Sequence, residues 1–267
     1  MAILKTGAIV LKGWKMGETS KILALYTRDY GKIKVIAKGG RGPKSKFKGC
    51  LEPLSRINVI YYDKRTRDLQ LLSQADLIDP YLKIIGDIER TTLSLAIAEL
   101  IYRAVSGEEP FPQIFDLLNA VLGQINRSHG FLEAYLWYFE SHFIELMGYK
   151  PTWDNCLECQ SSLGTDGGYF QPENGGLLCN RCGAVKGGLI VSGETLEILY
   201  WLQKNTLDDV GQLRPENLQK IEIRKMFDLY FKTHIEHMRS LRSLSLYYKY
   251  NPALVAGNSL TLGTNGC

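Results

Sequence analysis

Two Cys-x-x-Cys pairs constrain the folding of this sequence more than any other feature. Cys156 and Cys159 form the first pair, and Cys179 and Cys182 form the second. A Cys-x-x-Cys turn places two sulfurs within reach of one ion, so two such turns complete a tetrahedral shell of four thiolates. That shell suits zinc and leaves no position open for water or substrate. The sequence therefore predicts one structural Zn2+ ion.

The segment around these cysteines, residues 153–186, is short and rich in glycine, which allows tight turns around a metal. Two disulfides or an iron–sulfur cluster are the alternatives. Zinc deaminases also use a Cys-x-x-Cys pair, but it follows an H-x-E element, whereas His234–Glu236 comes after both pairs here. Cys50 and Cys267 are left over as single thiols with buried or incidental roles.

The chain has 267 residues, which is enough for two folded units in addition to the cysteine segment. No stretch is both long and apolar enough to cross a membrane. The first ten residues include Lys5 and lack the continuous hydrophobic region of a secretory signal. We therefore expect a reducing, cytoplasmic location.

Positive charge is concentrated in one short stretch, from Gly31 to Lys48, which contains no acidic residue. The formal net charge of the chain is +4 and this stretch contributes +7, so the remainder carries −3. Such a local positive field favours a polyanionic partner. The basic residues are Lys32, Lys34, Lys38, Arg41, Lys44, Lys46 and Lys48.

The first eighty residues show the alternation of short β-strands. Strands are predicted at residues 6–11, 21–27, 31–38, 55–62 and 68–75, separated by turn residues. In the third strand, Ile33, Val35 and Ala37 occupy one face, and lysines occupy the other. Five short strands fit a small closed barrel such as the OB-fold, which binds single-stranded nucleic acid, although the number of strands also fits an SH3-like barrel.

Residues 39–49 form a basic connection that we expect to be a flexible loop with one aromatic side chain, Phe47. Lysines on such a loop can contact phosphates, and an aromatic ring can stack on an unpaired base. We therefore expect the seven basic residues to contact DNA and Phe47 to stack; the alternative is a solvated loop. A second basic and aromatic stretch would extend this surface or form a solvated helix end. It contains Arg239, Arg242, Lys249, Tyr247, Tyr248 and Tyr250.

Helical periodicity begins after Pro80. Three amphipathic helices are predicted within residues 93–104, 111–125 and 132–146. Ser192 is a predicted N-cap for a helix at residues 194–203, and a last helix is expected from Pro215 through Met238. Because helices flank the cysteine segment on both sides, we expect that segment to be an insertion in one helical domain.

The expected organisation is therefore α+β and multidomain. An OB-fold DNA-binding domain spans residues 1–80, and an α-helical domain spans residues 81–152 and 187–250. The zinc-binding insertion occupies residues 153–186. The uncharged tail at residues 251–267 is expected to be disordered.

Nothing in the sequence indicates catalysis. The phosphate-binding pattern GxxxxGK[ST], the nucleophile elbow GxSxG and the zinc-binding pattern HExxH are all missing from the sequence. The predicted class is thus a binding protein and not an enzyme.

Three segments of the sequence match the pattern of a known family. The first is residues 17–27, GETSKILALYT; the second is residues 31–41, GKIKVIAKGGR, with Lys44-Ser45 and Leu51–Pro53. The third is residues 147–151, MGYKP, which leads to the cysteines, with a glycine pair at 175–176 before Cys179. On these segments the sequence resembles the RecO family of bacterial DNA repair proteins, and the resemblance covers about residues 1–250.

The resemblance implies an OB-fold, a helical domain and a four-cysteine zinc insertion. It also implies binding to single- and double-stranded DNA, annealing of complementary strands without a nucleotide, and help in loading recombinase onto DNA coated by single-stranded DNA-binding protein. The implied partners are RecR and the acidic C-terminal tail of that coating protein, with RecF and RecA in the same pathway, at the bacterial nucleoid. A groove beside Arg103 or Arg127 would receive the tail.

Two other classes of function are compatible with a zinc site. A zinc-containing DNA-binding transcriptional regulator would read sequence through a basic helix, whereas the concentrated charge here is expected on a strand and a loop. A zinc-dependent nuclease or deaminase would need an open metal position, which four thiolates do not leave.

Overall fold

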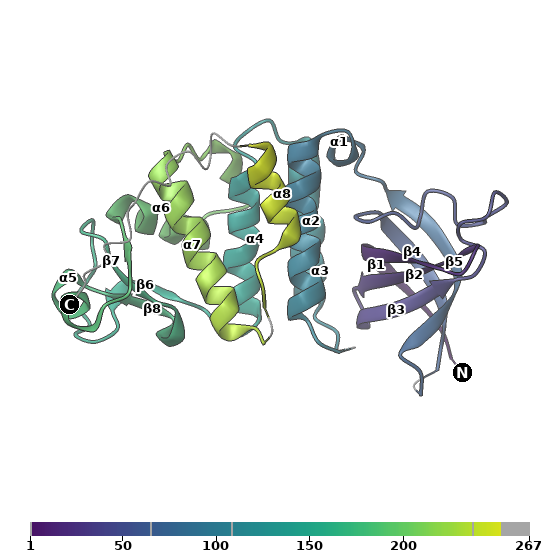
Figure 1. Ribbon diagram of the computed structural model, residues 1–267, viewed down its shortest axis with the longest axis horizontal. Coiled ribbons are helices and arrows are strands. Elements are labelled where there is room, and N and C mark those ends of the chain that lie inside the picture. Colours follow the sequence, from purple (N-terminus) through teal and green to yellow (C-terminus); the bar gives the residue numbers. More distant parts are fainter. Residues whose placement is uncertain (1, 65, 108, 237, 252–267) are drawn as a thin grey trace, which may run out of the picture.

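The computed structural model describes residues 2–64, 66–107, 109–236 and 238–251, and the tail predicted to be disordered lies outside the described residues except for Asn251. A β-barrel forms one end of the molecule, helices form the middle, and a small sheet with the cysteines forms the other end (Figure 1). The α+β prediction is confirmed.

Five strands close the N-terminal barrel, and each overlaps one of the predicted strand segments to within one residue at its start or end or contains it. They are β1 (Ala2–Met16), β2 (Ser20–Thr27), β3 (Gly31–Ala37), β4 (Arg56–Asp63) and β5 (Leu69–Asp79). The order is β1-β2-β3-β5-β4, with β4 returning to β1. Strands β3 and β5 run parallel and the other neighbours antiparallel, which is the topology of an OB-fold.

The barrel has a hydrophobic core of its own. In β3 the predicted alternation is confirmed, because Ile33, Val35 and Ala37 are buried in this core while Lys34 is exposed. On β1 and β2, the side chains that point away from the barrel interior, such as Ile9, belong to a second hydrophobic core that includes the helices. The outward-facing side of β1 and β2 is therefore the part of the barrel surface on which the helical domain packs.

Helices α2, α3 and α4 confirm the three helices predicted after Pro80. The described helices of the middle part are α1 (Leu82–Ile85), α2 (Ile88–Ala104), α3 (Pro112–Arg127), α4 (Glu133–Leu146), α6 (Gly193–Lys204), α7 (Asn217–His234) and α8 (Arg242–Tyr250), with a 3-10 turn η2 (Val210–Gln212). Ser192 caps α6 as predicted, since its hydroxyl accepts a hydrogen bond from the backbone N–H of Thr195. In the described part of the chain, no helix is long and apolar enough to cross a membrane.

The end of the chain differs from the predicted single last helix. Helix α7 ends at His234, the next residue adopts an extended conformation, and Met238 lies beyond the helix. A separate helix, α8, then packs against α2 and α4 (Figure 1). Helix α8 packs back on the helical domain because it has an apolar face that must be buried, and its Tyr247 is fully buried there.

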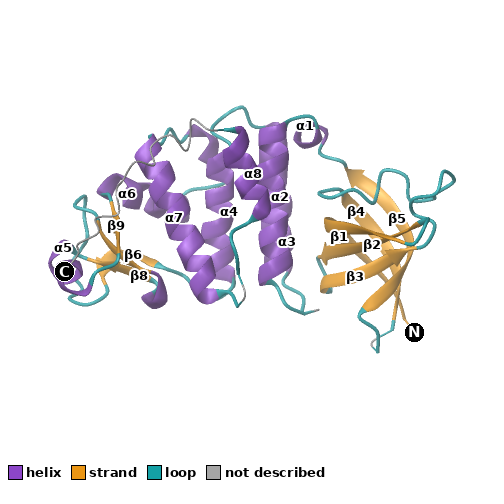
Figure 2. Ribbon diagram, in the orientation of Figure 1, coloured by secondary structure: helices purple, strands orange, loops and turns teal. Residues whose placement is uncertain are grey.

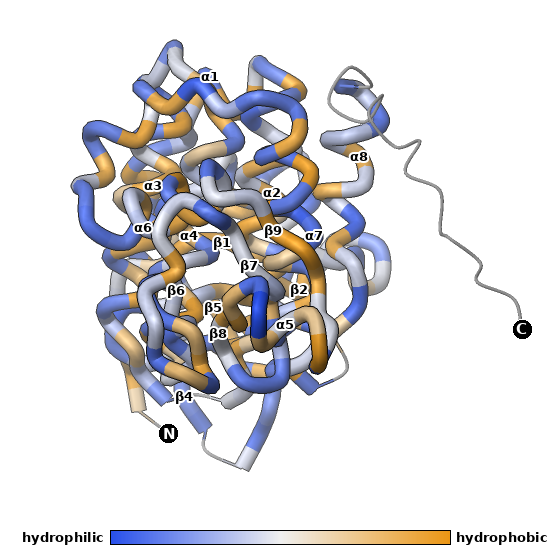
Figure 3. Tube along the Cα trace, turned by 90° about the vertical axis from the view of Figure 1, so that its left-hand side faces the viewer, coloured by the Kyte–Doolittle hydropathy of each residue, from blue (hydrophilic) through white to orange (hydrophobic). Residues whose placement is uncertain are grey.

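The cysteine segment forms a four-stranded sheet between α4 and α6. Its elements are β6 (Thr152–Cys156), β7 (Gly168–Gln171), η1 (Pro172–Asn174), β8 (Gly176–Leu178), α5 (Asn180–Lys186) and β9 (Leu189–Val191), in the sheet order β6-β8-β7-β9. Phe170 and Leu177 are buried in the core shared with the helices. Figure 2 shows the sheet at the end opposite the barrel, and in Figure 3 the hydrophobic residues of β9 contrast with the hydrophilic start of α5.

Candidate metal centre and nucleic-acid interface

The four cysteines converge from two turns of the small sheet. Cys156 ends β6 and is buried, Cys159 follows in a turn, and Cys179 and Cys182 lie at the start of α5. All four sulfurs lie within 4.8 Å of one another, and Sγ of Cys159 is 3.8 Å from Sγ of Cys179. A tetrahedral zinc ion with Zn–S bonds of about 2.3 Å requires sulfurs about 3.8 Å apart. The cluster can therefore hold a metal ion, and its spacing is compatible with zinc.

Backbone hydrogen bonds fix the two turns. The N–H of Cys156 donates to the carbonyl of Ser161 at 2.8 Å, and the N–H of Gln160 donates back to the carbonyl of Cys156 at 3.0 Å. In the second turn, the N–H of Gly183 donates to the carbonyl of Cys179 at 2.8 Å. The four cysteines are free thiols, so the disulfide alternative is not present.

The thiols differ in pKa, and the basic side chains of Arg181 and Lys186 lie near them. Hydrogen bonds from Ser161 lower the pKa of Cys159 to about 6, while burial and the neighbouring thiols raise the pKa of Cys182 to about 12. The guanidinium of Arg181 lies beside Cys159, which raises the arginine pKa. Lys186 pairs with Glu158 between the first two cysteines at 2.6 Å. The site thus places one thiol of lowered pKa beside the cation Arg181.

The basic stretch lies on the outer surface of the barrel, as an interface for a polyanion requires. Six of its side chains are exposed to solvent: Lys34, Lys38, Arg41, Lys44, Lys46 and Lys48. Lys32 differs, because it is half-buried and its Nζ donates a 2.8 Å hydrogen bond to the carbonyl of Tyr102 on α2. Burial and the nearby Lys34 lower the pKa of Lys32.

Phe47 does not occupy the position that the sequence suggested. It is only 2% exposed and lies in the barrel core with Cys50 and Leu51, so its ring cannot stack on a base. The connection between β3 and β4 is therefore anchored by buried side chains instead of moving freely. Arg41 attaches this connection at a further point, because its backbone N–H donates a hydrogen bond to the carbonyl of Thr19 at 2.7 Å. We call residues 38–51 the basic plug.

The second basic and aromatic stretch is also different from the expected DNA surface. Tyr247 is buried, and its hydroxyl donates to Glu133 on α4 at 3.2 Å. The hydroxyl of Tyr248 donates to the other oxygen of Glu133 at 2.5 Å. These tyrosines hold α8 against the helices, whereas Arg242 and Lys249 are exposed. Helix α4 carries three glutamates, Glu133, Glu140 and Glu145, so the sequence alone did not single out Glu133 as the partner of α8.

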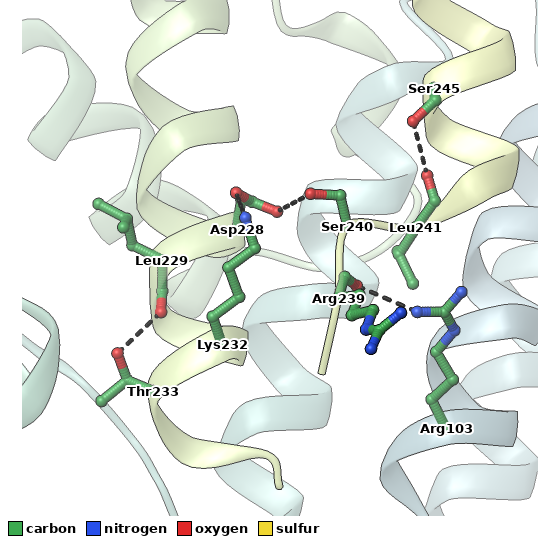
Figure 4. A network of polar contacts seen from close by, with 9 residues as sticks. All are labelled: Arg103, Asp228, Leu229, Lys232, Thr233, Arg239, Ser240, Leu241 and Ser245. Atoms are coloured by element: carbon green, nitrogen blue, oxygen red, sulfur yellow. Dashed lines mark hydrogen bonds and ion pairs between the residues drawn. The ribbon is translucent and has the colours of Figure 1, made fainter. Parts of the chain in front are cut away.

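An apolar cavity lies on the helical domain between α4, α7 and α8. Its wall includes Trp137, Phe227 and Leu244, and its charged lining residues are Arg224, Arg239, Glu140 and Asp228. Arg103 on α2 donates a hydrogen bond to the carbonyl of Arg239 at 3.2 Å (Figure 4). Of the two arginines suggested by the sequence, Arg103 is thus beside this cavity, and Arg127 does not line it.

These features define a class of mixed α+β protein, with an N-terminal OB barrel and a four-cysteine metal cluster set among helices. The family model "Recombination protein O N terminal" matches residues 1–81, and "Recombination protein O C terminal" matches residues 85–244. The relatives include the protein named DNA repair protein RecO in Chloroherpeton thalassium, which is 30% identical over 253 residues, covering 92% of this chain and 98% of the relative.

A second relative of the same name, from Pelotomaculum thermopropionicum, is 31% identical over 254 residues, covering 95% of this chain and 96% of the relative. A third, from Dehalococcoides mccartyi, is 30% identical and covers 82% of this chain and 86% of the relative. The chain belongs to the RecO family of DNA repair and recombination proteins. This result confirms the resemblance found in the sequence and does not favour the transcriptional regulator.

Proposed function

We propose that this protein is a recombination mediator that binds single- and double-stranded DNA and anneals complementary strands without a nucleotide. It also helps to load recombinase onto DNA coated by single-stranded DNA-binding protein. The observation that supports this most directly is the set of exposed cations on the outer surface of an OB barrel, in a chain of the RecO family. Within this proposal the protein has no catalytic residue.

The proposed mechanism is electrostatic. Two complementary strands repel each other through their phosphates, so a surface that binds phosphates lowers the cost of bringing them together. Contacts to phosphates leave the base edges free to pair. We assign the phosphate contacts to the six exposed residues Lys34, Lys38, Arg41, Lys44, Lys46 and Lys48 and leave out the half-buried Lys32.

The other parts of the chain have supporting roles in this proposal. Residues 1–80 form the DNA-binding domain, and residues 81–152 and 187–250 form the helical domain that receives protein partners. The insertion at residues 153–186 holds one structural Zn2+ ion through Cys156, Cys159, Cys179 and Cys182, and it braces the helices. Four sulfurs within 4.8 Å of one another support this assignment, since a tetrahedral shell of four thiolates leaves no ligand position for chemistry.

The test is annealing of two complementary oligonucleotides, one fluorescently labelled, without nucleotide. The variant Lys44→Ala/Lys46→Ala/Lys48→Ala removes three charges from the basic plug. A matched control, Lys83→Ala/Lys150→Ala/Lys204→Ala, removes three exposed charges outside the basic plug, on or beside helices α1, α4 and α6. We expect the parent and the control to anneal rapidly and the plug variant to anneal at least tenfold more slowly.

Salt dependence gives an independent measure. If six cations contact phosphates, log Kd for a single strand should change with log salt concentration with a slope of about 4 in magnitude, and the plug variant should lose about 2. A zinc-loaded, folded parent that does not anneal would overturn the mediator proposal. A slope near zero would overturn its electrostatic mechanism.

We propose further that the apolar cavity on the helical domain receives the acidic C-terminal tail of single-stranded DNA-binding protein. Its apolar wall and the guanidinium groups of Arg224 and Arg239, which lie beside the carboxyl groups of Glu140 and Asp228, support binding of an acidic peptide. RecR, RecF and RecA complete the proposed partners. A fluorescent tail peptide should bind the parent and an Arg127→Glu control equally, and Arg239→Glu should bind it at least tenfold more weakly. Equal binding by both variants would exclude this cavity.

A further inference from the structure

The cavity on the helical domain adjoins a larger groove, and the two form one pocket. The cavity has a volume of about 30 Å3, which is room for one water-sized group. The groove has a volume of about 250 Å3 and lies over α7, α8 and the connection between them. Arg224, Asp228, Leu241, Leu244 and Tyr248 line both. A peptide in the groove therefore has room to insert one small group into the cavity.

Glu140 of α4 lies at the inner end of this pocket. It lines the cavity but not the groove, and it is only 4% exposed. Among the described residues, no group forms a hydrogen bond or an ion pair with its carboxyl group. Leaving a buried carboxyl group without a partner is costly, because it has lost its contacts with water. The cavity beside it is the place where a ligand atom can supply that partner.

Carboxylates, and not cations, act most strongly on Glu140. Burial raises its pKa well above the ordinary value, and the charges of Glu133 on α4 and Asp228 on α7 raise it further. Glu133 is itself held by the hydroxyls of Tyr247 and Tyr248. Glu140 is therefore a neutral carboxylic acid over a pH range in which an exposed glutamate is ionised. In that form it can donate a hydrogen bond into the cavity.

The cations of the pocket remain available to an acidic ligand. Arg224 and Arg239 line the cavity, and none of the ion pairs between described residues includes either guanidinium. Asp228 is already engaged, because it pairs with Lys232 at 2.5 Å and accepts a hydrogen bond from Ser240 at 3.3 Å (Figure 4). The pocket thus offers two cations and one neutral acid to a ligand that carries carboxylates.

We propose that Glu140 sets the selectivity of this pocket by donating a hydrogen bond to one carboxylate of an acidic peptide whose other carboxylates contact Arg224 and Arg239. The inference rests on the proposed binding of the acidic tail and assigns a further residue to that site. An ionised Glu140 would repel the same peptide, so binding keeps the proton on Glu140. Affinity therefore falls as the pH rises through the pKa of Glu140. A peptide with amides in place of carboxylates accepts weaker hydrogen bonds and loses its attraction to both arginines.

The test is binding of a fluorescein-labelled peptide of the acidic tail to the full chain, measured by anisotropy from pH 5 to 9. The parent should lose affinity roughly tenfold or more over this range. Glu140→Gln keeps a donor that does not titrate, so it should match the parent at pH 5 and hold its affinity as the pH rises. Glu140→Leu removes the donor and should bind about tenfold more weakly at pH 5. The matched control is Glu145→Leu, at an exposed position of the same helix, and it should follow the parent.

Proton uptake gives a second measurement, which decides the question if Glu140→Leu does not fold. Calorimetric titration at pH 8 in two buffers of different ionisation enthalpy should show that the parent takes up a proton on binding the peptide and that Glu140→Gln takes up none. An equal decline of affinity with pH in the parent and in Glu140→Gln would overturn the role of Glu140. If Arg239→Glu still loses binding in that case, the proposed tail pocket stands without this role. A folded parent that binds no tail peptide at any pH would overturn the proposed pocket itself.

Discussion

The barrel and the cysteine sheet are both small β structures at opposite ends of the helices, but different forces hold them together (Figure 2). The barrel strands have seven to fifteen residues, close on themselves, and enclose a separate hydrophobic core. The strands of the cysteine sheet have three to five residues, and their apolar side chains join the core of the helical domain. A closed barrel satisfies its own backbone hydrogen bonds, whereas an open sheet of such short strands depends on a cross-link.

The largest expected effect is therefore loss of the metal. Cys156→Ser should release the proposed zinc ion and unfold the cysteine sheet while the barrel stays folded, because structural zinc contributes about 10–16 kcal/mol of binding free energy in small modules. Metal content and circular dichroism before and after chelation measure this effect. The control is Cys50→Ala, since Cys50 is buried in the barrel core away from the metal ligands. Equal metal content in the parent and in Cys156→Ser would show that the four thiolates do not hold the ion.

The second prediction concerns the barrel, whose stability should depend on packing and not on metal. Phe47→Ala should lower the free energy of unfolding by about 3–5 kcal/mol, because it removes a large side chain from a closed core. It should also weaken DNA binding, since Phe47 anchors the basic plug that carries Lys44, Lys46 and Lys48. Denaturant unfolding and oligonucleotide binding measure these two effects. If Phe47→Ala kept the full stability of the parent, the assignment of Phe47 to the barrel core would be contradicted. The zinc content of this variant should equal that of the parent.

A third prediction separates the helical domain from both ends. Burial, together with Glu133 and Asp228, raises the pKa of Glu140 well above its ordinary value of 4.5. Between pH 4.5 and the raised pKa, the folded protein keeps a proton that the unfolded chain has lost. Stability therefore falls as the pH rises through this window. Glu140→Gln should remove that decline and raise stability at pH 8 by on the order of 1 kcal/mol.

The measurement for Glu140→Gln is thermal unfolding across pH 5–8, with Glu145→Gln, an exposed residue of the same helix, as the control. Zinc content and DNA binding should be the same in both variants and the parent. A parallel fall of stability with pH in Glu140→Gln would show that another group is responsible.

Local patterns in the sequence were sufficient for much of this architecture. The spacing of the cysteines predicted their convergence, and the alternation around Ile33 and Val35 predicted a barrel strand, because both depend on neighbours in the chain. The fate of Phe47 depends on the distant strands that close around it, so a basic loop with one aromatic residue resembled a DNA contact. Tyr247 was mistaken for a surface residue for the same reason, since its partner Glu133 is more than one hundred residues earlier.

The contact between the rings of Trp14 and Tyr102 could not be predicted from the sequence, because these residues come from separate parts of the fold. Their contact depends on the bulge in β1, which changes the face on which Trp14 lies without leaving a clear sequence signal. The six exposed cations of the barrel were identified from the sequence, but only the structure separates them from Lys32, which is bound to the carbonyl of Tyr102.

The smallest expected effect tests whether surface ion pairs contribute to the cysteine sheet. Lys186 on α5 pairs with Glu158 in the first cysteine turn at 2.6 Å, and both side chains are 53% exposed. Water screens such a pair, so Lys186→Ala should lower stability by less than about 1 kcal/mol and leave the zinc content unchanged. Thermal unfolding beside a Lys204→Ala control measures the difference. A loss as large as that of Cys156→Ser would mean that charge pairing, and not the metal, holds the two cysteine turns together, and the contrast between the two β structures would have to be explained differently.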